Sequence, residues 1–186
     1  MKKVIAACVL ALAGTAQAST IFDFTGPFAV GNWTFATTDD GSVDTTGAPA
    51  SIVLTGGDSG SGADSTTDFT IHVGQDTLIS FSWSYETEDD DAFYDPFGYL
   101  LGADPGSLLF TQLTADGTTD PQSGVASVFV QFGETFGFRG FSIGSEFGAG
   151  VTTIGEFRAA VPEPSALALV SLALLAGAVT RRRRAA

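Results

Sequence analysis

The stretch that decides the fold is Thr77-Leu-Ile-Ser-Phe-Ser-Trp-Ser-Tyr85. From Ile79 to Tyr85 a large apolar or aromatic side chain occupies every second position, and a serine occupies each position between. Successive side chains of a β-strand point to opposite faces, so this alternation predicts a strand with one buried face and one polar face. Phe69–Val73 repeats the pattern just upstream. Two such segments so close together favour an antiparallel sheet.

The same short pattern recurs along the chain, and no segment keeps a helical period over three turns. Clusters of Gly, Asp, Pro and Ser separate the runs, as is typical of turns between strands. We therefore predict an all-β fold, a single antiparallel β-sandwich of jelly-roll type over residues 19–160. The further predicted strands are Thr20–Phe24, Asn32–Ala36, Ala50–Thr55, Phe97–Leu101, Leu108–Leu113, Val125–Phe132, Thr135–Ile143 and Val151–Arg158.

The N-terminus has the composition of an export signal. Lys2 and Lys3 precede an apolar segment, Val4–Gly14, and small residues at 16 and 18 predict cleavage between Ala18 and Ser19. We assign residues 1–18 to a signal peptide that signal peptidase removes. A lipoprotein signal ending at Cys8 is the alternative, but it would leave almost no apolar segment before the cysteine.

The C-terminus combines three elements within residues 161–186. Val161-Pro162-Glu163-Pro164 comes first, and its two prolines favour an extended backbone. Residues 165–180 are apolar and predict a single transmembrane helix, of about 24 Å at 1.5 Å per residue. Arg181, Arg182, Arg183 and Arg184 follow, and such a cluster stays on the cytoplasmic side of a membrane. The helix is short for a hydrocarbon core of about 30 Å, which predicts a transient anchor.

This tail resembles the PEP-CTERM sorting signal of Gram-negative bacteria that make exopolysaccharide. The resemblance implies that an exosortase cuts the chain near Pro162-Glu163-Pro164. It implies a precursor in the inner membrane with a cytoplasmic C-terminus, and a mature protein that is extracellular or at the cell surface. Exopolysaccharide is the partner that the resemblance suggests. A permanent anchor that is never cleaved is the alternative.

Charge is distributed very unevenly along the chain. Residues 19–160 hold 20 of the 21 acidic residues but only two basic ones, Arg139 and Arg158, a net charge of −18. Nucleic acid binding needs clustered Lys and Arg to neutralise phosphates, so nucleic acid is excluded as a partner. Cys8 is the only cysteine, so the exported part has neither a disulfide nor a thiolate metal site.

One carboxylate cluster follows directly on the Thr77–Tyr85 strand. Calcium binds six to eight hard oxygen ligands, which loops between strands can supply. We state calcium as a hypothesis, and a solvated acidic loop is the alternative. The proposed ligands are Glu88, Asp89, Asp90, Asp91 and Asp95.

Catalytic residues are hard to find in this sequence. The single histidine, His72, falls on the polar side of a predicted strand, and no Gly-x-Ser-x-Gly elbow between a strand and a helix accompanies it. Glu134 and Glu146 form one carboxylate pair that could serve glycoside hydrolysis. We therefore expect a non-enzymatic surface or biofilm-matrix protein, with a secreted carbohydrate-active enzyme on the same scaffold as the alternative.

Overall fold

The computed structural model describes residues 19–161. The predicted signal peptide, the Pro-Glu-Pro motif, the apolar helix and the arginine cluster lie outside these residues. Of the predicted processing residues, the structure describes Ser19 and Val161, at the two ends of the described range. Thr20–Val161 forms one compact unit with its own hydrophobic core. Both sheets and the core between them are complete within this unit, so we expect it to fold without the flanking segments.

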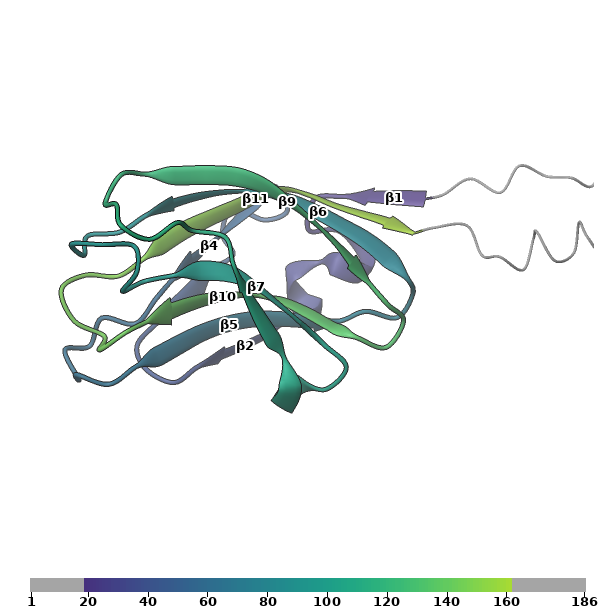
Figure 1. The fold of residues 1–186 in the computed structure, drawn as a ribbon. Coiled ribbons are helices and arrows are strands. Elements are labelled where there is room, and N and C mark those ends of the chain that lie inside the picture. Colours follow the sequence, from purple (N-terminus) through teal and green to yellow (C-terminus); the bar gives the residue numbers. More distant parts are fainter. Residues whose placement is uncertain (1–18, 162–186) are drawn as a thin grey trace, which may run out of the picture. The chain divides into compact units, whose positions relative to one another are not determined.

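Two antiparallel sheets face each other (Figure 1). Sheet A has the order β3-β4-β11-β6-β9, and β1 also pairs with β11. Sheet B has the order β2-β5-β10-β7-β8. The strands of sheet A are β1 Ser19–Phe22, β3 Ser42–Asp44, β4 Ser51–Thr55, β6 Thr77–Glu86, β9 Gln122–Val130 and β11 Val151–Val161; those of sheet B are β2 Thr34–Thr37, β5 Ser65–His72, β7 Phe97–Gly102, β8 Leu109–Gln112 and β10 Thr135–Ser142.

The core lies between the sheets and is rich in aromatic side chains. In β6 the alternation predicted from sequence is confirmed, because Ile79, Phe81 and Tyr85 are fully buried while the serines between them face outward. Phe136 and Phe138 of β10 meet Phe81 from the opposite sheet, with ring centroids 6.1 and 4.9 Å away. Edge-to-face and tilted contacts of this kind stabilise a core beyond simple area burial.

The two-sheet sandwich is confirmed, and every predicted strand overlaps an observed one. The prediction missed β3, a three-residue strand that pairs with β4 and is too short to show alternation. It also began β9 at Val125, three residues late, because Gly124 interrupts the pattern. The described residues contain three short 3₁₀ turns, Gly26–Phe28, Val30–Asn32 and Pro105–Ser107, and none of their helices has the length to cross a membrane.

A β-bulge divides β11 into two halves. The register against β6 runs Gly155↔Ser82 and then resumes at Arg158↔Ser80, so β11 contains one extra residue. Glu156 takes a left-handed conformation there, with φ 47°. Before the bulge even-numbered residues point inward, whereas after it Phe157 and Ala159 do. The bulge thus brings Phe157 into the core and bends the strand beside the groove described below.

Both ends of the described chain leave from one end of the sandwich. β1 begins at Ser19, β11 ends at Val161, and the two strands are paired (Figure 1). The loops after β6 and after β10 lie at the opposite end, where the Ile143 amide donates to the Tyr94 carbonyl. The acidic loop therefore lies at the end of the sandwich opposite Ser19 and Val161.

Candidate functional site

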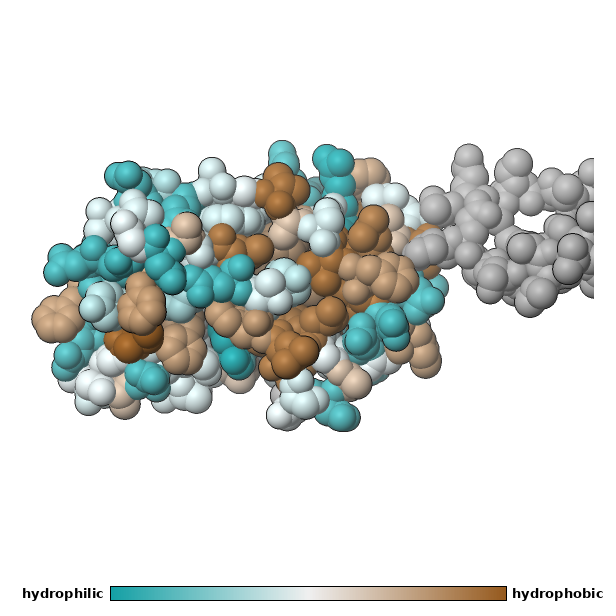
Figure 2. Space-filling model, viewed as in Figure 1, coloured by the Kyte–Doolittle hydropathy of each residue, from teal (hydrophilic) through white to brown (hydrophobic). Residues whose placement is uncertain are grey.

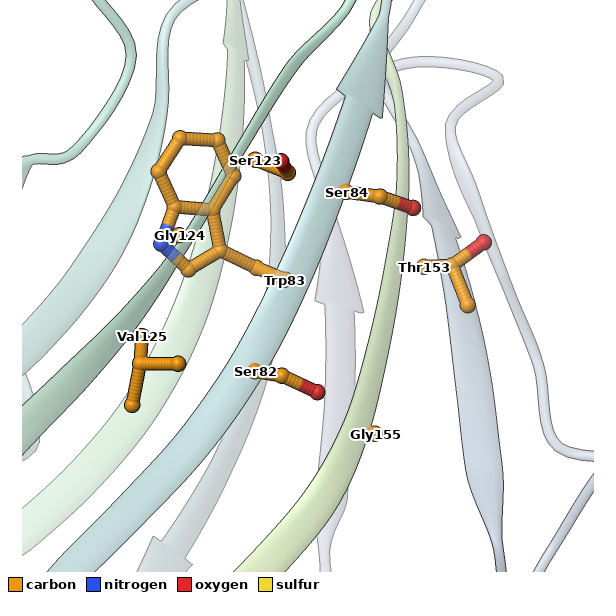
Figure 3. Close-up of a pocket in the computed structure, with 8 residues that line it drawn as sticks. All are labelled: Ser82, Trp83, Ser84, Ser123, Gly124, Val125, Thr153 and Gly155. Atoms are coloured by element: carbon orange, nitrogen blue, oxygen red, sulfur yellow. The ribbon is translucent and has the colours of Figure 1, made fainter.

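A shallow groove of about 430 Å³ lies on the outer face of sheet A. It crosses three neighbouring strands, β11, β6 and β9, near the end of the sheet where β6 ends and β9 and β11 begin (Figure 3). Ligand pockets in proteins usually have volumes of about 300–1,000 Å³, so the groove has room for a small ligand or part of a polymer. Its lining residues are Ser82, Trp83, Ser84, Ser123, Gly124, Val125, Thr153 and Gly155.

Strand register arranges the outward-facing residues of the groove in two rows. In the first row Ser84 lies between Thr153 of β11 and Ser123 of β9. In the second row Ser82 lies between Gly155 and Val125. Directly opposite residues on one face are about 4.5–5.5 Å apart, so the first row sets three hydroxyls side by side across three strands.

The four hydroxyls of Ser82, Ser84, Ser123 and Thr153 form no hydrogen bond to another described residue. A hydroxyl can both donate and accept, so each of them can pair with an incoming polar group of either kind. No residue of the lining is titratable. The groove therefore presents neutral hydrogen-bonding groups and no charge.

Trp83 and Gly124 lie opposite each other in the register, between the two rows. A Cβ atom at residue 124 would come within 3.0 Å of Cζ2 and Nε1 of the indole, so only glycine fits there without a shift of the ring (Figure 3). The Nε1–H of Trp83 donates to no group of the described residues, and it is in contact with solvent. In this it differs from Thr67 Oγ1, which also lacks a partner but is fully buried. A buried indole N–H normally finds a partner, so this donor is available to a ligand or to water.

The sequence predicted the serine face of β6 but not the groove. Ser84 and Ser123 are 39 positions apart, and only the pairing of β6 with β9 makes them neighbours. The one signal in the sequence was a run of serines on the outer face of a strand whose inner face is aromatic. That signal cannot identify which strands flank β6.

The acidic loop is ordered by its own carboxylates. Asp95 is buried, and its two oxygens accept hydrogen bonds from Ser142 Oγ at 2.6 Å and Thr87 Oγ1 at 2.8 Å. Asp91 Oδ1 accepts from the backbone N–H of Phe93 and of Gly117, at 2.8 and 2.7 Å. These bonds connect β6, β10 and the loop after β8 at one end of the sandwich.

The same loop sets the ionisation of its acids. Burial raises the pKa of the Asp95 carboxyl, and the Ser142 and Thr87 hydroxyls oppose that rise by stabilising the carboxylate. The backbone N–H groups of Phe93 and Gly117 lower the pKa of Asp91. Burial also raises the pKa of the Tyr85 hydroxyl, which donates to the Asp95 carbonyl.

Glu88 and Asp90 are exposed, whereas Asp89 and Asp95 are buried. Asp89 Oδ1 accepts from the next backbone N–H, that of Asp90, at 2.6 Å. Within residues 19–161 no three Asp, Glu, His or Cys side chains converge closely enough to hold a metal ion. Calcium binding at Glu88, Asp89, Asp90, Asp91 and Asp95 stays a prediction.

The carboxylate pair considered for hydrolysis is not brought together. Glu134 lies in the turn between β9 and β10, where Oε2 accepts from the Gln131 backbone N–H, and Glu146 lies in the loop after β10. The eight residues of β10 separate them by about 26 Å at 3.3 Å per residue, whereas glycosidase carboxyls are about 5–10 Å apart. His72 is exposed at the end of β5, on the rim of a pocket of about 100 Å³.

Comparison with protein families decides what the tail is. Residues 160–184 match the PEP-CTERM protein-sorting motif. The match spans the Pro-Glu-Pro residues, the apolar segment and the arginine cluster, so the sequence-based recognition of this motif is confirmed. No curated protein matches the chain.

Solved structures with a similar fold have very different sequences. The family 11 carbohydrate-binding module of a Clostridium thermocellum cellulosomal cellulase is 9% identical, with 80% of this chain and 97% of that chain covered and a TM-score of 0.41. A xylan-binding domain from Paenibacillus barcinonensis is 11% identical, with 80% and 99% covered and a TM-score of 0.42. A cleaved adhesin domain of Lys-gingipain from Porphyromonas gingivalis is 11% identical, with 79% and 99% covered and a TM-score of 0.41. Scores this low support no argument about the ligand of this chain.

Proposed function

We propose that this protein is an exported, non-enzymatic surface or matrix protein that binds a neutral polysaccharide through the groove on sheet A. The PEP-CTERM motif supports export and processing: signal peptidase would act between Ala18 and Ser19, and an exosortase near Pro162-Glu163-Pro164. The mature protein would then reach the cell surface or the extracellular matrix. The C-terminal arginines, Arg181–Arg184, would hold the precursor in the inner membrane until cleavage.

One observation carries the binding role, namely the four hydroxyls that have no hydrogen-bond partner within residues 19–161, in a groove without charge. A sugar chain presents hydroxyls at short, regular intervals, and each of them is both a donor and an acceptor. Rows of serine and threonine hydroxyls match that chemistry, whereas an ionic ligand would need an opposite charge in the lining. The open, shallow shape suits a polymer that passes along the sheet.

The same lining argues against catalysis at this site. Hydrolysis of a glycosidic bond needs an acid and a base or nucleophile beside the scissile bond. The groove has neither, since its polar groups are serine and threonine hydroxyls, an indole N–H and backbone. A serine nucleophile would need an activating base, and none lines the groove.

A paired-serine test separates this groove from the rest of the sheet. Residues 19–161 would be screened against neutral and anionic polysaccharides by affinity gel electrophoresis, and a bound neutral polymer would then be titrated by calorimetry. We expect the double variant Ser84→Ala with Ser123→Ala to weaken binding by about fivefold to 150-fold, because each lost hydrogen bond is worth about 0.5–1.5 kcal/mol.

Ser80 and Ser127 provide the matched control. They face each other on the same two strands and also point outward, but neither lines the groove. Ser80→Ala with Ser127→Ala should leave the affinity unchanged. Equal losses in both double variants, or binding of anionic polymers alone, would contradict the proposal.

A further inference from the structure

The edge strand β9 differs from every other edge of the described sandwich. The two strand orders end at β3 and β9 and at β2 and β8, and the four-residue strand β1 lies beside β11. Three of these edge strands have only three or four residues, whereas β9 has nine. Its register against β6 runs without a bulge from Thr77↔Val130 to Tyr85↔Gln122. β9 is therefore a long, regular edge whose outer side is unpaired within residues 19–161.

The usual protections of an edge strand are missing from β9. Sheet edges are normally kept apart by charged residues, proline or bulges, and Gln122–Val130 contains none of these. Val125 is 74% exposed and Phe129 49% exposed. Figure 2 shows apolar side chains gathered in the middle of the face where Figure 1 places β9 and β7. An exposed apolar edge of this length is a surface for strand pairing.

We propose that β9 pairs antiparallel with β9 of a second copy of this chain, about a two-fold axis through Ser127. Such a dimer joins two copies of sheet A into one continuous sheet. Closed two-fold dimers need a self-complementary patch, because each residue meets its counterpart on the same surface. Backbone hydrogen bonds give such an edge pairing its affinity, and side chains set its register.

The sequence of β9 is complementary to its own reverse about Ser127. On the outer face Ser127 meets Ser127 of the second copy, and Val125 meets Phe129. On the inner face Ala126 meets Val128, and Gly124 meets Val130. Every apolar residue of β9 therefore faces an apolar side chain, except Val130, which faces Gly124. Cross-strand pairs matched in this way stabilise one register over its neighbours.

Charge also favours a second copy at this edge. Residues 19–160 have a net charge of −18, so two copies repel each other over most of their surfaces. β9 has no charged residue, so pairing along this edge places no like charges of the strand opposite each other. The proposed dimer does not depend on polysaccharide binding. It would place two grooves in one sheet, because Ser123 and Val125 belong to both the groove and the edge.

Disulfide trapping tests the register of this dimer. The only natural cysteine is Cys8, which lies outside residues 19–161, so Ser127→Cys introduces a single thiol. Opposite residues in an antiparallel pair have Cα atoms about 4.5–5.5 Å apart, within the range of about 4.4–6.8 Å that disulfides need. We expect most of the Ser127→Cys protein to form a disulfide-linked dimer on mild oxidation.

Ser123→Cys is the matched control for that experiment. Ser123 has the same side chain, lies on the same strand and is exposed on the same face. In the proposed register it faces Gln131, so two copies of residue 123 are about 27 Å apart at 3.4 Å per residue. It should remain monomeric on a non-reducing gel. Equal cross-linking of both variants, or of neither, would overturn the register.

A charge-exchange experiment tests the dimer without a covalent bond. Ser127→Lys and Ser127→Glu each place like charges at the axis, so each variant alone should sediment as a monomer where the unaltered protein sediments as a dimer. An equimolar mixture should recover the dimer, as a one-to-one complex in native mass spectrometry. Thr111→Lys on the short edge β8 is the control and should not change the dimer. A monomeric unaltered protein at about 100 µM, or a mixture that stays monomeric, would overturn the proposal.

Discussion

The two tryptophans of the chain are equally buried, each 8% exposed, but their surroundings are opposite. Trp33 packs between Phe69 and Phe138 with centroids 5.0 and 5.5 Å away, and it contacts three further aromatic rings. Its Nε1–H donates to the Phe28 carbonyl at 3.0 Å. Trp83 has one aromatic neighbour, Phe97, and an Nε1–H without a partner among the described residues.

The comparison separates a closed side of the sandwich from an open one. On the closed side, the Trp33 ring contacts five aromatic rings and its N–H has a partner, so Trp33 contributes stability and has no polar group free for a ligand. On the open side, around Trp83, an indole N–H, four hydroxyls and the β9 edge all remain unpaired within residues 19–161. Recognition requires unsatisfied groups at the surface, which are those that the open side provides.

The largest expected effect comes from removing each tryptophan in turn. Trp33→Ala should lower the free energy of unfolding by about 3–5 kcal/mol, the usual range for a buried aromatic. Trp83→Ala should lower it by at least about 2 kcal/mol less, because Trp83 has four fewer aromatic pairs and each pair adds about 0.5–1.5 kcal/mol. Urea denaturation followed by far-UV circular dichroism measures both. Equal losses would mean that burial alone, and not aromatic contact, distinguishes the two sides.

Much of the buried core could be predicted from the sequence, and much of the open side could not. The inward residues Ile79, Phe81 and Tyr85 follow from alternation within one strand, because that pattern is local. The hydroxyl row depends on which strands flank β6, and strand order is not a local property. The bulge at Glu156 has a weak signal, since the apolar positions change parity between Ile154 and Phe157. β3 gave none, because three residues cannot show a period.

The acidic loop was predicted as a cluster but not as a set of buried hydrogen bonds. Asp89 and Asp95 are buried while Glu88 and Asp90 are exposed, and alternation cannot predict this in an irregular loop. The partner of Asp95, Ser142, is 47 positions away. The run of carboxylates suggested metal ligands, whereas the contacts show Asp91 and Asp95 bonded to backbone and hydroxyl groups.

A second prediction tests whether the loop end, unlike the aromatic side, responds to pH. Burial raises the pKa of Asp95 in the folded state, so the folded protein holds that proton more tightly than the unfolded chain does. Its contribution to stability is complete below the unfolded value of about 3.9 and is lost as the pH rises through the folded value. Relative to Asp95→Asn, the unaltered protein should therefore become less stable between pH 4 and pH 7.

Urea denaturation of both proteins at several pH values measures this difference. Acids such as Asp91, whose pKa is lowered, contribute in the opposite direction, but they are common to both proteins and cancel in the comparison. The difference in the free energy of unfolding between the unaltered protein and Trp33→Phe should not change with pH. If the difference between the unaltered protein and Asp95→Asn is also independent of pH, burial does not control the pKa of the Asp95 carboxyl.

The smallest expected effect concerns two glycines that both line the groove. A Cβ atom at residue 155 would have neighbours at 3.6 Å or more, which is ordinary contact, so Gly155→Ala should stabilise the protein by about 0.4–1 kcal/mol through the unfolded state. At residue 124 the added atom would lie 3.0 Å from the Trp83 ring, which must move by a few tenths of an ångström. Gly124→Ala should therefore lose that gain and be neutral or slightly destabilising, about 1 kcal/mol below Gly155→Ala. Thermal unfolding ranks the two variants.

A fluorescence measurement tests the movement of the ring directly. In a Trp33→Phe background Trp83 is the single tryptophan, and its fluorescence should shift with Gly124→Ala but not with Gly155→Ala. If both glycine variants are equally stable, the Trp83 ring moves aside at no cost in stability. The open side is then more easily deformed than the closed side, and it also has more polar groups without a hydrogen-bond partner.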